Sequence, residues 1–198
     1  MEGIRTAAEP RGDRRIQWVF LDRDGTLNAK APDGEYVERP QALELLPGVA
    51  EAIKKLNQAG IWTGVVTNQR GVALGRMSIE DLDAIHVWLR HLLSLDGAYL
   101  DAIYACTHQI GTCDCRKPDP GLLLRAQREH PGLDFARAAI VGDSASDVQT
   151  GKRLGLMTVL LSAEDEPRAA CEADYVVADL AGAVYRLLGE PIVPLARQ

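Results

Sequence analysis

The chain alternates short apolar runs with longer segments in which apolar residues recur every three or four positions. Short continuous apolar runs bounded by turn residues are typical of strands buried inside a sheet. Because both faces of such strands are covered, the pattern favours a parallel sheet. The runs that predict strands span residues 17–21, 61–67, 102–106, 138–141, 158–161 and 175–177.

The intervening segments have the spacing of amphipathic helices. In the first of them, Val49, Ile53 and Leu56 share one helical face. Ser78 and Asp81 form a capping-box pattern at the start of the second. Helices are predicted over residues 47–59, from residue 78 onward, and over 120–129, 146–154 and 180–188.

Strands that alternate with helices predict an α/β fold, a Rossmann-like doubly wound parallel sheet with helices on both faces. A chain of 198 residues suits one domain with a full hydrophobic core. We expect a single domain over residues 16–190, a flexible polar extension over 1–15 and a C-terminal tail over 191–198. In such sheets, active sites form beyond the carboxyl ends of the strands.

The composition is that of a soluble globular protein, with 46% hydrophobic and 25% charged residues. A net charge of -6 argues against nucleic acid as a partner, because phosphate backbones select basic surfaces. No apolar stretch approaches the roughly 20 residues that span a bilayer, and the polar N-terminal segment lacks a signal-peptide core. We therefore expect a cytoplasmic protein without a membrane partner, and we expect a monomer. A small phosphorylated metabolite remains a possible ligand.

Two acids, Asp22 and Asp24, directly follow the first predicted strand. Side chains two residues apart in extended chain point the same way, so both can face one substrate while Arg23 turns aside. Gly25 then lets the backbone leave the strand sharply. Such a pair offers a nucleophile or metal ligand and a proton carrier. Taken alone, the pattern also fits a capped turn.

Three further strands end in polar residues. The second predicted strand leads into Thr67 and Asn68, the third leads through a cysteine-rich loop to Lys117, and the fourth leads to Asp143. Any one of these could be a capped turn. Four polar ends at equivalent positions of one sheet favour a shared active site.

The polar segments after these four strands resemble, in kind and in order along the chain, the motifs of the haloacid dehalogenase superfamily of phosphohydrolases. The resemblance covers about residues 19–147. The resemblance implies that Asp22 takes the phosphoryl group as an aspartyl-phosphate. It implies that Asp24 protonates the leaving ester oxygen and then deprotonates the attacking water. It also implies that Thr67 and Lys117 hold the phosphoryl oxygens, with Asn68 alongside.

The same resemblance implies a catalytic Mg²⁺ held by Asp22, Asp143 and the backbone carbonyl of Asp24. A phosphate dianion beside two ionised carboxylates gathers about four negative charges, which need compensation. Mg²⁺ and Lys117 supply about three positive charges, and Mg²⁺ prefers a few carboxylates together with substrate oxygens. Arg116 is available to supply the rest.

Three of the four cysteines of the chain lie close together with a histidine: Cys106, His108, Cys113 and Cys115. Four soft ligands within ten residues match a closed tetrahedral Zn²⁺ site. Disulfides or unpaired cysteines are the alternatives, and a cytosolic chain disfavours disulfides. Four protein ligands leave no open position, so we expect a structural zinc that fixes the loop before Arg116.

Within the superfamily, this cysteine loop resembles two groups that lack a large cap domain, the heptose bisphosphate phosphatases and the histidinol-phosphate phosphatases. The motif residues look closer to the first group, and the short zinc loop is nearer the second. The resemblance suggests a substrate-binding set made of Asn68, Gln69, Arg70, Arg116, Asp33, Glu35 and Tyr36.

Three departures from these groups change the expected contacts. Ser144 stands where both groups tend to carry a basic residue after the metal-binding aspartate. Arg70 stands where the heptose enzymes commonly have a small residue, so it is a candidate replacement for the lost cation. The loop over residues 29–38 is also longer than in the typical heptose enzyme.

The resemblance thus implies a Mg²⁺-dependent sugar-phosphate phosphatase, with the C7 phosphate of a heptose 1,7-bisphosphate as the expected target. Histidinol-phosphate hydrolysis and polynucleotide 3'-phosphatase activity are the enzymatic alternatives. A non-catalytic, zinc-stabilised binding module is the alternative from another class, although the chain carries every acid that the chemistry requires.

Overall fold

The computed structural model describes residues 15–162 and 172–189. Its strands form one parallel sheet in the order β3-β2-β1-β4-β5-β6. The chain thus builds outward from β1 in one direction and then from β4 in the other, which is the doubly wound arrangement that the sequence predicts. The strands are β1 (Trp18–Leu21), β2 (Trp62–Asn68), β3 (Ala102–Cys106), β4 (Ala138–Gly142), β5 (Met157–Leu161) and β6 (Tyr175–Val177).

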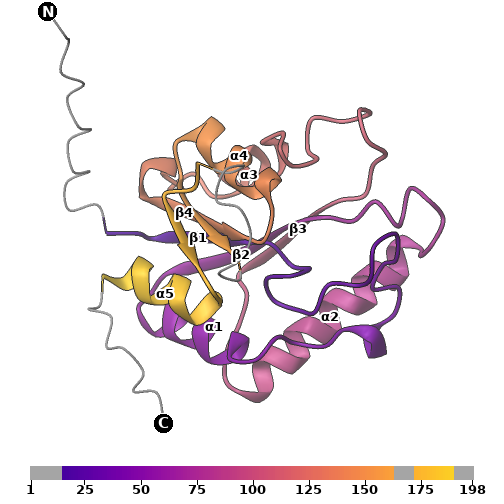
Figure 1. Cartoon of the computed structure of the whole chain (residues 1–198), viewed down its shortest axis with the longest axis horizontal. Helices are drawn as coiled ribbons and strands as arrows, with labels where there is room; N and C mark the ends of the chain where they lie inside the picture. The colour runs from indigo at the N-terminus through magenta and orange to yellow at the C-terminus, as the bar shows by residue number, and fades with distance from the viewer. Residues whose placement is uncertain (1–14, 163–171, 190–198) are drawn as a thin grey trace, which may run out of the picture.

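Helices cover both faces of this sheet (Figure 1). Helices α1, α2 and α5 pack on one face over the larger hydrophobic cluster, and α3 lies over the second cluster on the other face, beside α4. The prediction of a sheet covered on both sides is confirmed. The helices are α1 (Val49–Gln58), α2 (Ile79–Leu95), α3 (Gly121–Glu129), α4 (Ala145–Leu154) and α5 (Leu180–Leu188), with short 3-10 turns at Pro40–Ala42 and Phe135–Arg137.

Local signals in the sequence explain where the helices begin. The capping box at α2 is present, because Ser78 Oγ accepts from the Asp81 N–H and the Asp81 carboxylate accepts from the Ser78 N–H. In α1, the predicted apolar face of Val49, Ile53 and Leu56 is buried. The observed ends of strands and helices lie within two residues of the predicted ones. The end of the second helix was not predicted. Differences of this size are ordinary, because the ends of helices fray.

The strand register aligns the polar residues at one edge of the sheet. Leu21, the last residue of β1, pairs with Val65 of β2 and with Val141 of β4. Consequently Asp22 enters the same edge as Thr67 and Asp143, which follow those partners by two residues. The fold therefore delivers the predicted side chains to one place.

The connection between β1 and α1, over residues 22–48, contains only one short 3-10 turn, so the described residues include no large cap domain. The predicted tail over 191–198 lies outside the described residues, as does the predicted extension over 1–15 except for residue 15. In the part of the chain that the structure describes, no helix is long and apolar enough to cross a membrane.

Candidate active site

A cavity of about 310 Å³ opens at the carboxyl ends of the central strands. A cavity of this size suits a small metabolite rather than a polymer. Its walls come from the ends of β1, β2 and β4, the loop over residues 29–38 and the segment after the cysteine loop. Charged and polar side chains that line it include Asp22, Asp24, Lys30, Asp33, Glu35, Tyr36, Thr67, Asn68, Arg116, Lys117, Asp143, Ser144 and Ser146.

Lys117 lies at the base of this cavity with its ammonium group enclosed by oxygen atoms. Its Nζ lies 2.8 Å from Asp22 Oδ1 and 2.5 Å from Asp147 Oδ1, and it donates to the Val66 carbonyl at 2.8 Å. Burial lowers the pKa of Lys117, but the two carboxylates outweigh burial and raise it above its usual range. Lys117 is therefore a fixed positive charge beside Asp22.

The main chain of Lys117 is held as firmly as its side chain. Its N–H donates to Asn68 Oδ1 at 3.0 Å, and Asn68 Nδ2 donates back to the Lys117 carbonyl at 3.1 Å. Asn68 ends β2, so this pair ties the Lys117 segment to the sheet edge. Thr67, the residue before it, is buried and lines the cavity.

Asp22 is a buried carboxylate with a defined orientation. Its Oδ1 accepts from the backbone N–H of Arg23 at 2.7 Å as well as from Lys117. Burial raises the pKa of Asp22 to about 7, with Lys117 opposing that rise and Asp147 adding to it. Another cation in the site would favour the ionised form that a nucleophile requires.

Asp24 lies in a dense network of hydrogen-bond donors. Arg23 reaches both of its oxygens through Nη2 at 3.0 Å, Asn28 Nδ2 donates at 2.9 Å and Gln69 Nε2 donates at 2.7 Å. Burial raises the pKa of Asp24, but Arg23 and these amides outweigh it, so the pKa lies below its usual range. Arg23, expected to turn aside, is in fact completely buried and contacts His86.

Carboxylate oxygens of Asp22, Asp143 and Asp147 lie within 4.8 Å of one another. Asp147 is already satisfied, since Lys117 contacts its Oδ1 and Ser144 donates to its Oδ2. Asp22 and Asp143 remain as oxygen ligands that suit Mg²⁺. Gly25 is required here, because a Cβ at this position would lie 2.1 Å from Asp143 Oδ2.

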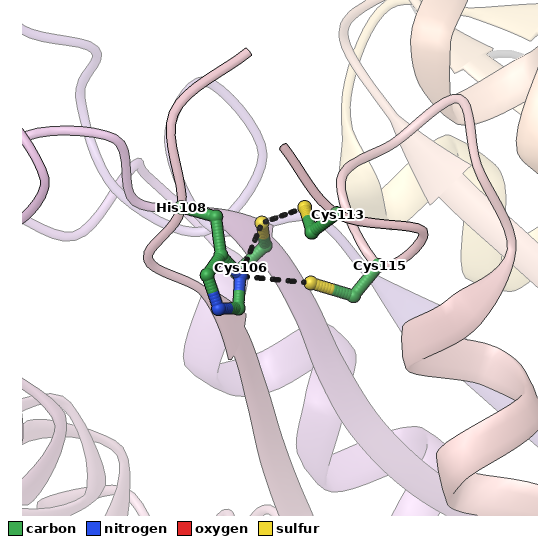
Figure 2. Close-up of side chains that lie close together, drawn as sticks. All are labelled: Cys106, His108, Cys113 and Cys115. Carbon is green, nitrogen blue, oxygen red and sulfur yellow. Dashed lines mark hydrogen bonds between the residues drawn. The ribbon is translucent and has the colours of Figure 1, made fainter. Parts of the chain in front are cut away.

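The four predicted zinc ligands converge as one cluster at the end of β3 (Figure 2). The Sγ atoms of Cys106 and Cys113 are 3.6 Å apart, and His108 Nδ1 lies 3.2 Å from Cys115 Sγ and 3.8 Å from Cys106 Sγ. Ligands of a tetrahedral zinc with ordinary bond lengths are about 3.5–3.8 Å apart. Two of the three spacings lie in this range and the third is slightly shorter, so the cluster is compatible with a zinc ion.

The predicted substrate-binding residues divide into two groups. Asp33, Glu35, Tyr36, Asn68 and Arg116 line the cavity. The Nη1 atom of Arg116 is buried and finds no hydrogen-bond partner among the described residues, as expected of a cation that awaits an anionic ligand.

Gln69 and Arg70 are absent from the described cavity walls. The Gln69 side chain is buried and bridges Asp24 and Thr67. Arg70 donates from Nε to Gln109 Oε1 at 3.1 Å, and Gln109 donates in turn to the Ala73 carbonyl. Arg70 thus connects the loop after β2 to the cysteine loop, whereas Ser144 lines the cavity.

Several residues at the site were not predicted from the sequence. Asp147 closes the Gly-Asp-x-x-x-Asp motif after β4 that supports the family resemblance, but the sequence assigned it no role in the site. Lys30 contacts Asp143 at 3.0 Å. His86 of α2 reaches the site only through Arg23. No sequence pattern indicates the last two, because their contacts depend on how distant segments meet.

Comparison with known proteins agrees with this geometry. The HAD-hydrolase-like family model matches residues 114–183. The D-glycero-beta-D-manno-heptose-1,7-bisphosphate 7-phosphatase of Rhodopseudomonas palustris is 38% identical over 168 residues, which are 81% of this chain and 89% of the relative. The D-glycero-alpha-D-manno-heptose-1,7-bisphosphate 7-phosphatase of Mycobacterium bovis is 44% identical over 135 residues, 67% of this chain and 70% of the relative.

Among solved structures, the D,D-heptose 1,7-bisphosphate phosphatase of B. bronchiseptica, complexed with magnesium and phosphate, superposes with a TM-score of 0.80. It is 32% identical, and the match covers 89% of this chain and 100% of that one. Fold, site and similarities together place the chain in the haloacid dehalogenase superfamily of hydrolases. Within that superfamily, it belongs to the family of the D-glycero-D-manno-heptose-1,7-bisphosphate 7-phosphatases.

Proposed function

We propose that this protein is a Mg²⁺-dependent phosphatase that removes the C7 phosphate from D-glycero-D-manno-heptose 1,7-bisphosphate. The observation that carries the proposal is the arrangement of Asp22, Lys117 and Asp143 at one end of a small cavity. The named function of relatives with the same fold and motifs supports the choice of sugar.

Asp22 is the nucleophile in this proposal. Its carboxylate oxygen forms a bond to phosphorus while the bond from phosphorus to the sugar C7 oxygen breaks, which leaves an aspartyl-phosphate. Lys117 and Thr67 bind the phosphoryl oxygens and keep phosphorus in line with Asp22. Asp22, Asp143 and the backbone carbonyl of Asp24 would hold Mg²⁺, which would supply positive charge to balance the dianion.

Asp24 carries the proton. Its lowered pKa makes it an anion in the free site, and an approaching phosphate dianion favours the protonated form. Asp24 takes up this proton from solvent as the substrate binds and then donates it to the departing sugar oxygen. In the second step it takes a proton from water as that water attacks phosphorus, which releases inorganic phosphate and restores Asp22. Arg23 and Gln69 hold its carboxylate in place for both steps.

The cysteine loop holds a structural Zn²⁺ in this proposal. Its four ligands fix the segment in which Cys115 directly precedes Arg116 and Lys117. The free energy of metal binding offsets the conformational entropy that is lost when this short loop, which has little hydrophobic core of its own, becomes ordered. The zinc therefore supports the position of Lys117 without taking part in the reaction.

Arg116, Asp33, Glu35 and Tyr36 contact the sugar phosphate in this proposal, since all four line the cavity. The arginine provides positive charge for an anionic oxygen, and the acids provide acceptors for sugar hydroxyls. A cytoplasmic location and a monomeric state stay predictions from the sequence. Gel filtration of the purified protein would test the monomeric state.

The test is a comparison of phosphate release with Mg²⁺ present. The substrates are the two anomers of heptose 1,7-bisphosphate, histidinol phosphate and a 3'-phosphorylated oligonucleotide. We expect the highest kcat/KM with a heptose bisphosphate, and a heptose 1-phosphate as the product. A preference for histidinol phosphate or the oligonucleotide would identify one of the alternatives. No release from any of them would favour a binding module.

A further inference from the structure

Lys30 is held at the cavity by an anchored stretch of backbone. Two residues before it, Asn28 is completely buried and donates to the Ala29 carbonyl at 2.8 Å. The Ala29 N–H in turn donates to the Glu44 carbonyl at 2.8 Å. The backbone of Lys30 therefore starts from a fixed point, whereas its side chain is 61% exposed and free to reorient.

The Lys30 ammonium contacts a carboxylate that is also a proposed metal ligand. Its Nζ lies 3.0 Å from Asp143 Oδ2, the oxygen that Gly25 leaves room for. An ammonium on this oxygen and a Mg²⁺ bound to the same carboxylate would place two cations within a few ångströms of each other. Like charges that close repel strongly, so Lys30 and Mg²⁺ compete for Asp143.

Lys117 and Arg70 already have other partners, and Arg116 makes no ion pair with Asp143 among the described residues. Lys117 is enclosed by Asp22, Asp147 and a carbonyl oxygen. Arg70 is bound to Gln109 outside the described cavity walls. Ser144, which follows Asp143, brings no charge, and its hydroxyl is used to cap α4. Lys30 is thus a cavity-lining cation that pairs, within the described part of the chain, with an acid that the metal also requires.

We propose that Lys30 exchanges partners during the reaction cycle: it neutralises Asp143 when Mg²⁺ is absent and binds a phosphate oxygen once Mg²⁺ has taken Asp143. The loop after β1 would then supply the positive charge that Ser144 does not. The inference rests on the proposed function only in that phosphate is the ligand, and it is independent of which sugar carries it.

The test measures two affinities in three variants of the zinc-loaded protein. Lys30→Met removes the charge and keeps the length, and Lys30→Arg keeps the charge. Lys55→Met is the matched control, because Lys55 also pairs with one acid at the surface but lies on α1, away from the cavity. Titration calorimetry gives the Kd of Mg²⁺ alone, and then the Kd of inorganic phosphate at saturating Mg²⁺.

We expect Lys30→Met to bind Mg²⁺ about two- to fivefold more tightly and, once loaded, to bind phosphate about two- to fivefold more weakly. Lys30→Arg should stay near the wild type in both measurements, and Lys55→Met should not differ from it. An unchanged or weakened Mg²⁺ affinity in Lys30→Met would overturn the proposal, as would an unchanged phosphate affinity. Because neither titration contains a sugar, failure to hydrolyse heptose bisphosphate would leave this test intact.

Discussion

Asn68 and Lys117 hold each other through two reciprocal hydrogen bonds, side-chain amide to peptide group, of 3.0 and 3.1 Å. The pair joins the end of β2 to the segment that leaves the cysteine loop. It explains how a lysine from an irregular segment reaches a fixed position beside Asp22. The reacting groups are thereby positioned by the sheet rather than by loops alone.

Replacing Asn68 with alanine should release this segment. Loss of two partly buried hydrogen bonds should lower the free energy of unfolding by about 1–3 kcal/mol and kcat/KM by about 10- to 100-fold, because Lys117 would lose its orientation. Denaturant unfolding and steady-state kinetics measure the two effects. Asn57→Ala is the control, since Asn57 accepts one backbone hydrogen bond far from the cavity. Equal kinetic effects in both variants would contradict the assigned role of Asn68.

Replacing Cys113 with serine should remove one zinc ligand. We expect a lower zinc content, a lower Tm and reduced activity together, because metal binding is coupled to folding of the loop. Elemental analysis and thermal unfolding measure the first two. Thr112→Ser, which keeps the neighbouring hydroxyl, should leave all three unchanged. A Cys113→Ser protein with full zinc content and an unchanged Tm would exclude the structural zinc.

Arg70 and Arg116 should behave differently when each is replaced by methionine. Arg116→Met should raise KM about tenfold or more, since Arg116 lines the cavity and its buried Nη1 has no hydrogen-bond partner among the described residues. Arg70→Met should leave KM unchanged and lower stability by less than about 1 kcal/mol, since Arg70 contacts Gln109. A raised KM in Arg70→Met would restore the sequence-based expectation that Arg70 replaces the cation missing at Ser144.

His86 should make stability dependent on pH. Burial lowers its pKa to about 4, and Arg23 and Arg90 oppose its protonation while Asp24 favours it. In the unfolded chain, His86 therefore binds a proton below about pH 6.5. In the folded chain, it binds that proton only below about pH 4. The stability associated with a neutral His86 is complete above pH 6.5 and is lost as pH falls through this window.

In His86→Gln, the free energy of unfolding should fall less between pH 6.5 and 4 than in the wild type, by about 2–3 kcal/mol. Denaturant titrations at several pH values measure this difference. His91→Gln is a suitable comparison, because His91 lies on the same helix but away from Arg23. Parallel pH profiles for wild type and His86→Gln would show that His86 is not held neutral.

The sequence was sufficient for the fold because each level of pattern agreed with the next. Apolar runs marked the strands, helical spacing marked the helices, and their alternation implied a doubly wound sheet whose carboxyl ends gather polar residues. Asp22, Asp24, Thr67, Lys117 and Asp143 could therefore be assigned to one edge before any geometry was known.

Contacts between distant segments could not be predicted in this way. Arg23 was expected to face away from the site. Its side chain is instead fully buried and donates hydrogen bonds to the Asp24 carboxylate. Arg70 was a candidate replacement for the cation missing at Ser144, and only the packing of the cysteine loop shows that Gln109 is its partner. Lys30 had no signal at all, because a single lysine in a polar loop is ordinarily a solvated residue.

The central claim is that Asp22 accepts the phosphoryl group, and chemical trapping tests it most directly. Protein mixed with heptose 1,7-bisphosphate and Mg²⁺ is quenched with borohydride, which reduces an aspartyl-phosphate to homoserine, and the peptides are then analysed by mass spectrometry. We predict reduction at residue 22 in the wild type and none in Asp22→Asn, which should also lack turnover. Rapid turnover with no reduction at residue 22, or with reduction at another acid, would contradict the mechanism.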